Sequence, residues 1–210
     1  MMARKVGIVA DSTACLPSEL ARDLDIRVVP VDMVFEGRIY RDGLDSDHAE
    51  FYDLLKKARR LPTTSAPSPH AYLEAMMEAG RGRDSVLCVT VSSRVSSMFR
   101  SATLAMEMAR ESAPGLQVRV LDSGTAAMAQ GFVALEAARQ AAAGRVLDEV
   151  EAAARGVASR VSIVAMLDTL YYLAKGGRIP RAAAWMGALL SIKPIMEFRQ
   201  GEARMLERAR

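Results

Sequence analysis

The 210-residue chain has few of the residues that build disulfide frameworks, metal centres and histidine-based active sites. Its two cysteines, Cys15 and Cys88, lie far apart and outside any CxxC or Cys/His spacing. This argues against a disulfide framework or a zinc site, and we interpret both as small buried hydrophobic residues. The two histidines, His48 and His70, fall in or beside predicted surface helices, which leaves few candidates for a histidine triad.

Long hydrophobic runs are missing as well. The longest, around residues 161–167 and 182–190, fall well short of the ~20 residues that a membrane span requires. The apolar run over residues 6–10 stops at Asp11, too early for the central region of a signal peptide. We therefore expect a cytoplasmic protein that does not span a membrane.

The charge is balanced overall but uneven along the chain. Half of the residues are hydrophobic, a quarter are charged, and the net charge is +3, as in a soluble globular protein. Residues 168–210 carry eight Lys or Arg against four Asp or Glu, or +4, which leaves −1 for residues 1–167. This segment suits an acidic ligand head group or an acidic partner. Nucleic acid is the least favoured partner, because no aromatic interleaving or nucleic-acid motif accompanies the charge.

Strands and helices are predicted to alternate over the first three quarters of the chain. Compact apolar runs at residues 6–10, 86–91 and 118–121 predict buried strands, each followed by a helical pattern. A further strand is predicted over residues 26–35, with Pro30 at an edge or bulge, and a loop over residues 61–69. The alternation predicts an α/β fold with a Rossmann-like, doubly wound, mostly parallel sheet.

The pattern changes after residue 158. A strand to about residue 165, helices over residues 168–175 and 182–190, and two strands joined by Gln200-Gly201 follow. We expect residues 1–158 to form an N-terminal α/β domain and residues 159–210 to begin a second α/β domain that is incomplete. An unfinished sheet exposes an edge and an apolar face, so we expect weakened ligand binding and dimerisation or aggregation.

Hydroxyl side chains gather where predicted strands end. The clusters are Ser12-Thr13, Ser92-Ser93, Ser123 with Thr125, and Thr63-Thr64-Ser65 in the predicted loop before residue 69. Ligands of open α/β sheets bind outside the carboxyl ends of the strands, where helix N-termini present free amides. Any single Ser or Thr there is more often a helix cap. Four clusters together favour a binding site for an anion, such as a carboxylate or a phosphate.

Motifs of catalysis are missing from this sequence. It contains no GxxxxGK[ST], GxGxxG, HExxH or GxSxG pattern, so no nucleotide cofactor or metal is expected. Asp11 and Asp122 end predicted strands, where a nucleophile or metal ligand can stand, but we favour a turn-holding role for both. Arg178 follows Gly176-Gly177 after a predicted helix, where a solvated loop charge is the ordinary interpretation.

Five segments together resemble the DegV family of bacterial fatty-acid-binding proteins. They are Asp11-Ser12-Thr13, Thr64 to Ser68, Ser92-Ser93 with Val95-Ser96, Asp122-Ser123 with Gly131, and Leu170 to Pro194 (LYYLAKGGRIPRAAAWMGALLSIKP). The resemblance extends from about Lys5 to Arg208. It implies a two-domain protein that encloses one long-chain fatty acid between its domains and is not itself an enzyme.

The resemblance also implies the contacts and the partner. Thr64 and Ser93 match the positions that hold the fatty acid carboxylate, with Ser65 as neighbour and Arg178 near that end of the site. Ser12, Ser92 and Ser96 are further candidates. The bound fatty acid is the ligand, with no metal and no other cofactor. The implied partner is an ATP-dependent fatty acid kinase subunit, which converts the presented acid to acyl phosphate for phospholipid synthesis.

The sequence departs from the family pattern near the head group. The segment Val95-Ser96-Ser97-Met98-Phe99 stands where Leu-Ser-Gly-Thr-Tyr is common, and Ala66 stands where glutamine is common. Family members also continue for several tens of residues past the last residue of this sequence. The resemblance implies that this additional part supplies a histidine near the head group and the rest of the second domain. From the residues alone, an enzyme or binding protein for a phosphorylated small molecule stays open, with Asp11 as base or metal ligand. A regulatory module with a merely structural lipid also stays open.

Overall fold

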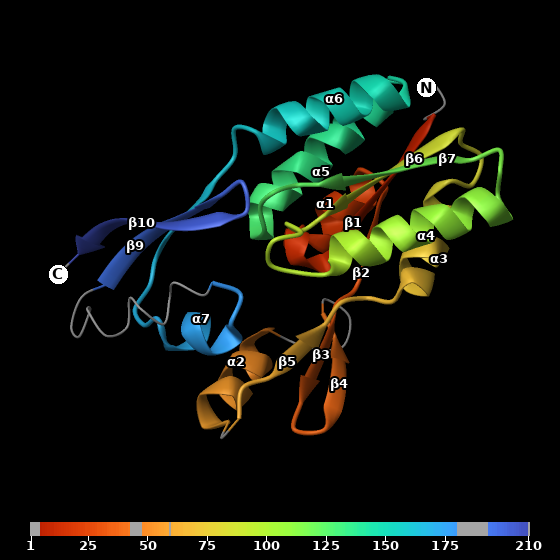
Figure 1. The fold of residues 1–210 in the computed structure, drawn as a ribbon. Coiled ribbons are helices and arrows are strands. Elements are labelled where there is room, and N and C mark those ends of the chain that lie inside the picture. The colour runs from red at the N-terminus through yellow and green to blue at the C-terminus, as the bar shows by residue number, and fades with distance from the viewer. Residues whose placement is uncertain (1–4, 43–47, 59, 180–192, 210) are drawn as a thin grey trace.

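The computed structural model describes residues 5–42, 48–58, 60–179 and 193–209. A four-stranded parallel sheet lies at the centre, in the order β2-β1-β6-β7 (Figure 1). Its strands are β1 (Val6–Asp11), β2 (Ile26–Val29), β6 (Ser85–Thr90) and β7 (Gln117–Asp122). The predicted α/β fold class with a doubly wound parallel sheet is confirmed.

The two central strands, β1 and β6, are buried at every residue. Their nearly continuous apolar sequences suit a parallel sheet that helices cover on both faces, since neither side of such a strand meets water. The edge strands β2 and β7 contain both buried and more exposed residues. The strongest strand signals in the sequence therefore mark the middle of the sheet.

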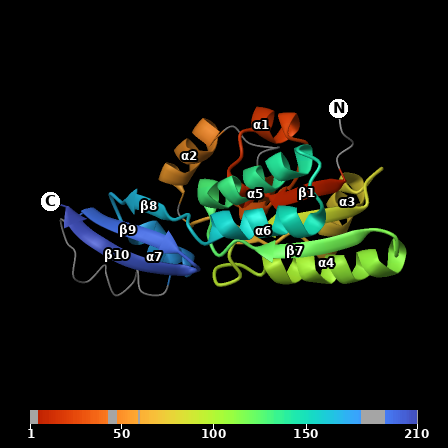
Figure 2. The same cartoon turned by 90° about the horizontal axis from the view of Figure 1, so that it is seen from above.

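Helices pack on both faces of this sheet (Figures 1 and 2). One face carries α1 (Ser18–Asp23), α5 (Ala127–Ala142) and α6 (Leu147–Ala158), with Val133 of α5 packed in one core with Ile8 and Leu87. The other face carries α3 (Pro69–Ala79) and α4 (Met98–Ser112), with Tyr72 and Met76 in a second core. The sheet is thus the middle layer of three.

The order of the strands creates a switch in chain direction between β1 and β6. From β1 the chain crosses outward to β2 on one side, and from β6 it crosses outward to β7 on the other. In open α/β sheets the loops at such a switch part from each other and leave a crevice beyond the carboxyl ends of the strands. Here those ends are Asp11 and Thr90.

A small antiparallel sheet, in the order β4-β3-β5, corrects two predictions. It consists of β3 (Asp32–Phe35), β4 (Arg38–Arg41) and β5 (Thr63–Ser65). The single strand predicted over residues 26–35 is wrong: the chain leaves the parallel sheet at Pro30, which has no N–H to donate to a strand ladder. The loop predicted over residues 61–69 is also wrong in part, because β5 pairs with β3. Helix α2 (His48–Lys57) precedes β5.

The C-terminal segment forms a third sheet, antiparallel, in the order β10-β9-β8. Its strands are β8 (Ile163–Met166), β9 (Lys193–Arg199) and β10 (Glu202–Ala209), and α7 (Tyr171–Gly176) follows β8. The helix predicted over residues 182–190 lies outside the described residues. The division into domains at residue 158 stays a prediction. Within the described ranges, every helix is too short or too polar to cross a membrane.

The two cysteines differ from each other. Cys88 is fully buried in β6, as predicted, and burial raises the pKa of its thiol. The interpretation of Cys15 as buried is wrong: it is exposed, in a left-handed conformation that ends the 3₁₀ turn Ser12–Ala14. Partial desolvation of its thiol, and then the carboxylates of Asp42 and Asp11, raise the pKa of Cys15.

Candidate functional site

A cavity of about 460 Å³ lies beyond the carboxyl end of β6. Three segments that are distant in sequence line it: β5 with the residue after it, the loop from β6 into α4, and the turn after α7. The described lining residues are Thr64, Ala66, Ser93, Arg94, Val95, Ser96, Ser97, Met98 and Arg178. The structure therefore brings together four of the predicted site residues: Thr64, Ser93, Ser96 and Arg178.

One wall of the cavity is formed by β5 of the small antiparallel sheet together with the turn that follows α7. Thr64 sits in β5 opposite Met33 of β3, and its hydroxyl accepts a hydrogen bond of 3.4 Å from Nη2 of Arg178. The left-handed Gly177 (φ 70°) ends α7, and Arg178 turns back to donate from Nη1 to the Gly176 carbonyl at 2.8 Å. The Gly-Gly turn thereby places an exposed guanidinium at the cavity.

The opposite wall is held by Asp122 at the end of β7. Its Oδ2 accepts the backbone N–H of Ser93 at 3.2 Å, and its Oδ1 accepts the N–H of Gly124 at 2.8 Å. The turn-holding role predicted for Asp122 is thus only part of its function, because the same carboxylate spans two loops. The backbone amide of Ser93 is committed to Asp122, which leaves the Ser93 hydroxyl as the group it offers to the cavity.

Ser92 is buried and holds this loop in place through hydrogen bonds. Its N–H donates to the Thr125 carbonyl at 2.8 Å, and its hydroxyl accepts the N–H of Arg94 at 3.3 Å. The predicted candidate Ser92 is therefore a support of the loop and is not among the described residues that line the cavity. Arg94, which sequence reasoning missed, does line it.

The start of α4 closes the floor of the cavity. Ser96, Ser97 and Met98 line it, and the Ser96 hydroxyl accepts the N–H of Met98 at 3.3 Å. The first turn of α4 holds no acidic residue, so the partial positive charge of the helix N-terminus is not neutralised there. The described lining residues carry the charges of Arg94 and Arg178 and no carboxylate. This arrangement is suited to an anion.

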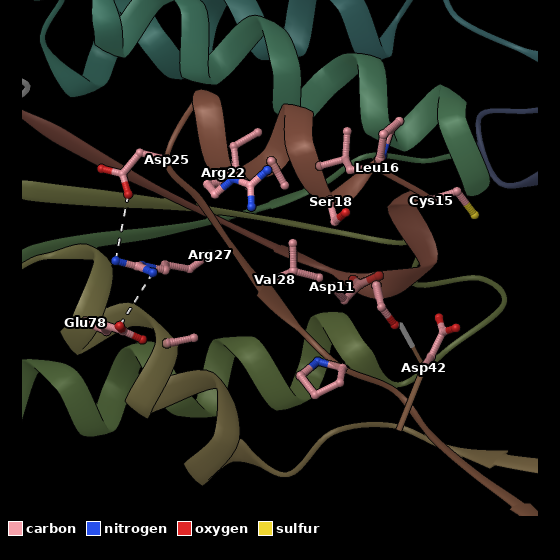
Figure 3. Close-up of a pocket in the computed structure, with 16 residues that line it drawn as sticks. Asp11, Cys15, Leu16, Ser18, Arg22, Asp25, Arg27, Val28, Asp42 and Glu78 are labelled. Atoms are coloured by element: carbon pink, nitrogen blue, oxygen red, sulfur yellow. Dashed lines mark ion pairs between the residues drawn. The ribbon is translucent and has the colours of Figure 1, made fainter. Parts of the chain in front are cut away.

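Two predicted residues lie elsewhere. Ser65 follows Thr64 in β5, and because side chains alternate along a strand, it faces away from the side that Thr64 presents. The Ser12 hydroxyl accepts the N–H of Val31 at 3.1 Å and thereby holds the chain where it leaves the parallel sheet. Ser12 lines a separate groove of about 920 Å³ beside the edge strand β2, where Arg27 pairs with Asp25 and Glu78 (Figure 3).

Asp11 is fully buried at the switch between β1 and β6. Its Oδ2 accepts the N–H of Val91 at 3.0 Å and the Tyr72 hydroxyl at 3.5 Å. Its Oδ1 accepts the Gln130 side-chain amide at 3.1 Å and a short hydrogen bond from the Thr13 hydroxyl. Burial raises the pKa of Asp11, although these hydrogen bonds act in the opposite direction. Asp11 therefore ties two strands and two helices together, which is more than the turn-holding role predicted for it.

Gln130 and Tyr72 are the partners that the sequence reasoning missed. Gln130 is a single buried amide in the alanine-rich helix α5, and it also lies 3.0 Å from the Thr13 hydroxyl. A polar residue among the small and apolar residues of the first turns of such a helix is a signal that could have been noticed, because a buried amide needs hydrogen-bond partners. In the described part of the chain, no group of three His, Cys, Asp or Glu side chains could hold a metal ion.

Comparison with known proteins identifies a family whose match covers nearly the whole chain. The family described as "Uncharacterised protein, DegV family" matches residues 5–210. A DegV domain-containing protein of Streptomyces coelicolor is 39% identical over 210 residues, which cover 100% of this chain and 73% of that protein.

Two solved structures are similar over nearly the whole chain. A DegV family protein from Thermus thermophilus, described by its fatty acid binding, is 33% identical with a TM-score of 0.88, covering 98% of this chain and 72% of that one. DegV from Bacillus subtilis, described as a fatty acid binding protein, is 32% identical with a TM-score of 0.86, covering 99% and 73%. On the strength of a match over residues 5–210 and these two folds, the chain belongs to the DegV family.

Proposed function

We propose that this chain binds a long-chain fatty acid and holds its carboxylate in the cavity lined by Thr64, Ser93 and Arg178. The observation that carries the proposal is the convergence of these residues, from three separate segments, on one cavity without a described carboxylate. The fatty acid binding described for the DegV proteins of Thermus thermophilus and Bacillus subtilis supports it.

The chemistry of the lining favours a carboxylate. Hydroxyl groups and a guanidinium donate charge-assisted hydrogen bonds, which are about twice as strong as neutral ones. The N-terminus of α4 adds a favourable dipole at the floor of the cavity. An acyl chain leaving the head group would meet the apolar lining residues Ala66, Val95 and Met98. One end of the ligand is thus held by polar groups and the other by packing.

We further propose that the bound acid is presented in the cytoplasm to an ATP-dependent kinase subunit, which forms the acyl phosphate. Arg178 is exposed and touches the head-group residue Thr64, so it can face both ligand and partner. The chemistry would belong to the partner. The sequence has no phosphate-binding loop, and Asp11 is buried with both oxygens accepting hydrogen bonds from protein groups, so it is poorly placed to take a proton from a ligand.

The experiment that tests this function is the extraction of ligand from protein purified from its native host, followed by mass spectrometry and titration with a fluorescent fatty acid. We expect a long-chain fatty acid bound one to one. Recovery of a phosphorylated small molecule, or saturable ATP binding by the isolated protein, would instead favour an enzyme or carrier for phosphorylated compounds. Inorganic phosphate as a competitor distinguishes the two, because it should displace a phosphorylated ligand more readily than a fatty acid.

A further inference from the structure

The turn between β9 and β10 lies against the loops that follow β6 and β7 (Figures 1 and 2). It consists of Gln200 and Gly201, and we call it the hairpin tip. The N–H of Gly201 donates to the carbonyl of Gly124 with an N···O distance of 2.6 Å. Both residues of the tip have positive φ, 50° and 75°, the conformation of a two-residue turn whose twist matches its strands.

The hairpin tip fits its position closely. A Cβ atom on Gly201 would lie 2.5 Å from Cδ of Arg94 and 3.0 Å from the hydroxyl oxygen of Ser92. On the facing loop, a Cβ atom on Gly124 would lie 3.5 Å from Cα of Gln200. Residues 92–94, which carry the head-group serine, are therefore in direct contact with a turn more than a hundred positions later in the chain.

A series of hydrogen bonds connects the hairpin tip to Ser93. Gly201 donates to Gly124, Gly124 donates to Asp122, and Asp122 also accepts the N–H of Ser93. A second connection runs beside it, because Nη1 of Arg94 lies 3.8 Å from the carboxylate of Glu202. In the hydrogen-bonded series every group is backbone or the short side chain of Asp122, so a shift of the tip reaches Ser93 with little loss.

We infer that the hairpin tip is a positioning element of the acid site: docking of Gly201 on Gly124 holds the Ser93 loop in the geometry that faces the cavity. This inference rests on the proposed function only for the identity of the ligand. Because coupling between two sites is reciprocal, a fatty acid that favours the ordered loop also favours the docked hairpin. Undocking of the β8–β9–β10 sheet would then release the ligand.

Gly201→Ala is the direct test, and Gly82→Ala is its matched control. Gly82 has a φ of 68°, close to that of Gly201, but a Cβ atom there would meet nothing within 4 Å. Both variants carry the backbone cost of a side chain at positive φ, and only Gly201→Ala adds the steric conflict. We expect Gly201→Ala to weaken fatty acid binding by about tenfold or more, and Gly82→Ala by no more than about twofold.

Amide hydrogen exchange in the ligand-free protein gives an independent readout. Gly201→Ala should increase exchange at Ser93 and Gly124, while Gly82→Ala should leave both unchanged. Placing Arg94→Ala in the Gly201→Ala background removes the closest conflicting atoms, so part of the protection at Ser93 should return. A protein that is merely less stable overall would not recover in this way.

The possible outcomes separate the inference from the proposed function. Equal exchange at Ser93 in the two glycine variants would overturn the inference. A wild-type protein that binds no fatty acid would contradict the proposed function, while exchange at Ser93 would still decide the inference. Should Gly201→Ala fail to fold, Asp122→Asn tests the same series of bonds, because it removes one of two acceptor oxygens. Unchanged exchange at Ser93 and Gly124 in that variant would also overturn it.

Discussion

The guanidinium of Arg178 donates a hydrogen bond to the hydroxyl of Thr64, which stands 114 positions earlier in the chain. At 3.4 Å between exposed groups, this contact is long and contributes little to folding stability. Its value is in placing a cation and a hydroxyl side by side at the cavity. Both groups are therefore free to exchange a weak mutual contact for stronger bonds to a ligand carboxylate.

Replacing Ser93, the serine proposed to bind the carboxylate, should weaken fatty acid binding. Ser93→Ala removes one charge-assisted hydrogen bond, so we expect a loss of about 1.5 to 3 kcal/mol, or one to two orders of magnitude in affinity. A fluorescent fatty acid titration measures it. Ser112→Ala is the control, because this exposed serine at the end of α4 bonds only the Met108 carbonyl among described groups. Equal affinities in the two variants would place the carboxylate elsewhere.

Arg178→Ala should separate binding from transfer. The arginine is exposed and touches Thr64, so its loss should impair acyl-phosphate formation with the proposed kinase subunit more than it impairs fatty acid affinity. The measurements are a titration and a coupled ATP assay on the same preparation. Lys175→Ala controls for general loss of positive charge, because Lys175 is not among the described residues that line the cavity. Its Nζ instead lies 6.0 Å from the centre of the Tyr171 ring, on the same helix α7. Proportional losses in both assays would make Arg178 simply a head-group ligand.

The buried carboxyl of Asp11 should give stability an acid-side dependence. Burial raises its pKa in the folded protein above the ordinary 3.8, so the folded state binds a proton more tightly than the unfolded state. Relative to Asp11→Asn, the wild type should gain stability as the pH falls through the folded-state pKa toward 3.8. Urea unfolding of both proteins between pH ~7 and pH ~4 measures this difference. A wild type that instead loses stability relative to Asp11→Asn as the pH falls would show that the hydrogen bonds lower the pKa of Asp11 by more than burial raises it.

Glu151 of α6 should behave in the opposite way. Burial favours the neutral acid, but hydrogen bonds from Arg119 at 2.7 Å and from Arg155 lower its pKa below 4.5 overall. Its contribution to stability is present above pH 4.5 and is lost as the pH falls through the lowered pKa. Glu151→Gln should destabilise the protein by about 1 to 3 kcal/mol at neutral pH.

The control for Glu151 is Glu149→Gln. Glu149 pairs with Arg145 at 3.2 Å, but both side chains are half exposed, so a loss of at most about 0.5 kcal/mol is expected. Thermal or urea unfolding of the two variants provides the comparison. A similar loss in both would mean that the partly buried position of Glu151 adds nothing.

The sequence could predict the parallel sheet because its central strands are continuous apolar runs. It could not predict the small antiparallel sheet, since Thr63–Ser65 is too short to show a period and its partner strand is separated by α2. The clustering of hydroxyls at strand ends predicts an anion site, which stays a prediction. Assignment of Thr64 and Arg178 to it came from the family resemblance, because nothing in their local sequence relates one to the other.

Contacts between segments that are distant in sequence could not be predicted for the same reason. A pattern around Asp122 shows a turn, but whether its carboxylate also receives the amide of Ser93 depends on how two loops approach each other. The prediction that Cys15 is buried was wrong for a similar reason. A short apolar neighbourhood indicates burial, whereas the left-handed turn after Ala14 directs the thiol outward.

The mostly exposed strands β4 and β5 make the small antiparallel sheet a candidate for the first part of the molecule to unfold locally. Thr64 of this sheet lines the cavity, and most of the other described lining residues belong to the loop after β6 and the turn after α7. A bound ligand would act as a cross-link between these segments. Resistance to limited proteolysis should consequently spread through β3 and β4 when the cavity is filled, although neither strand is among its described lining.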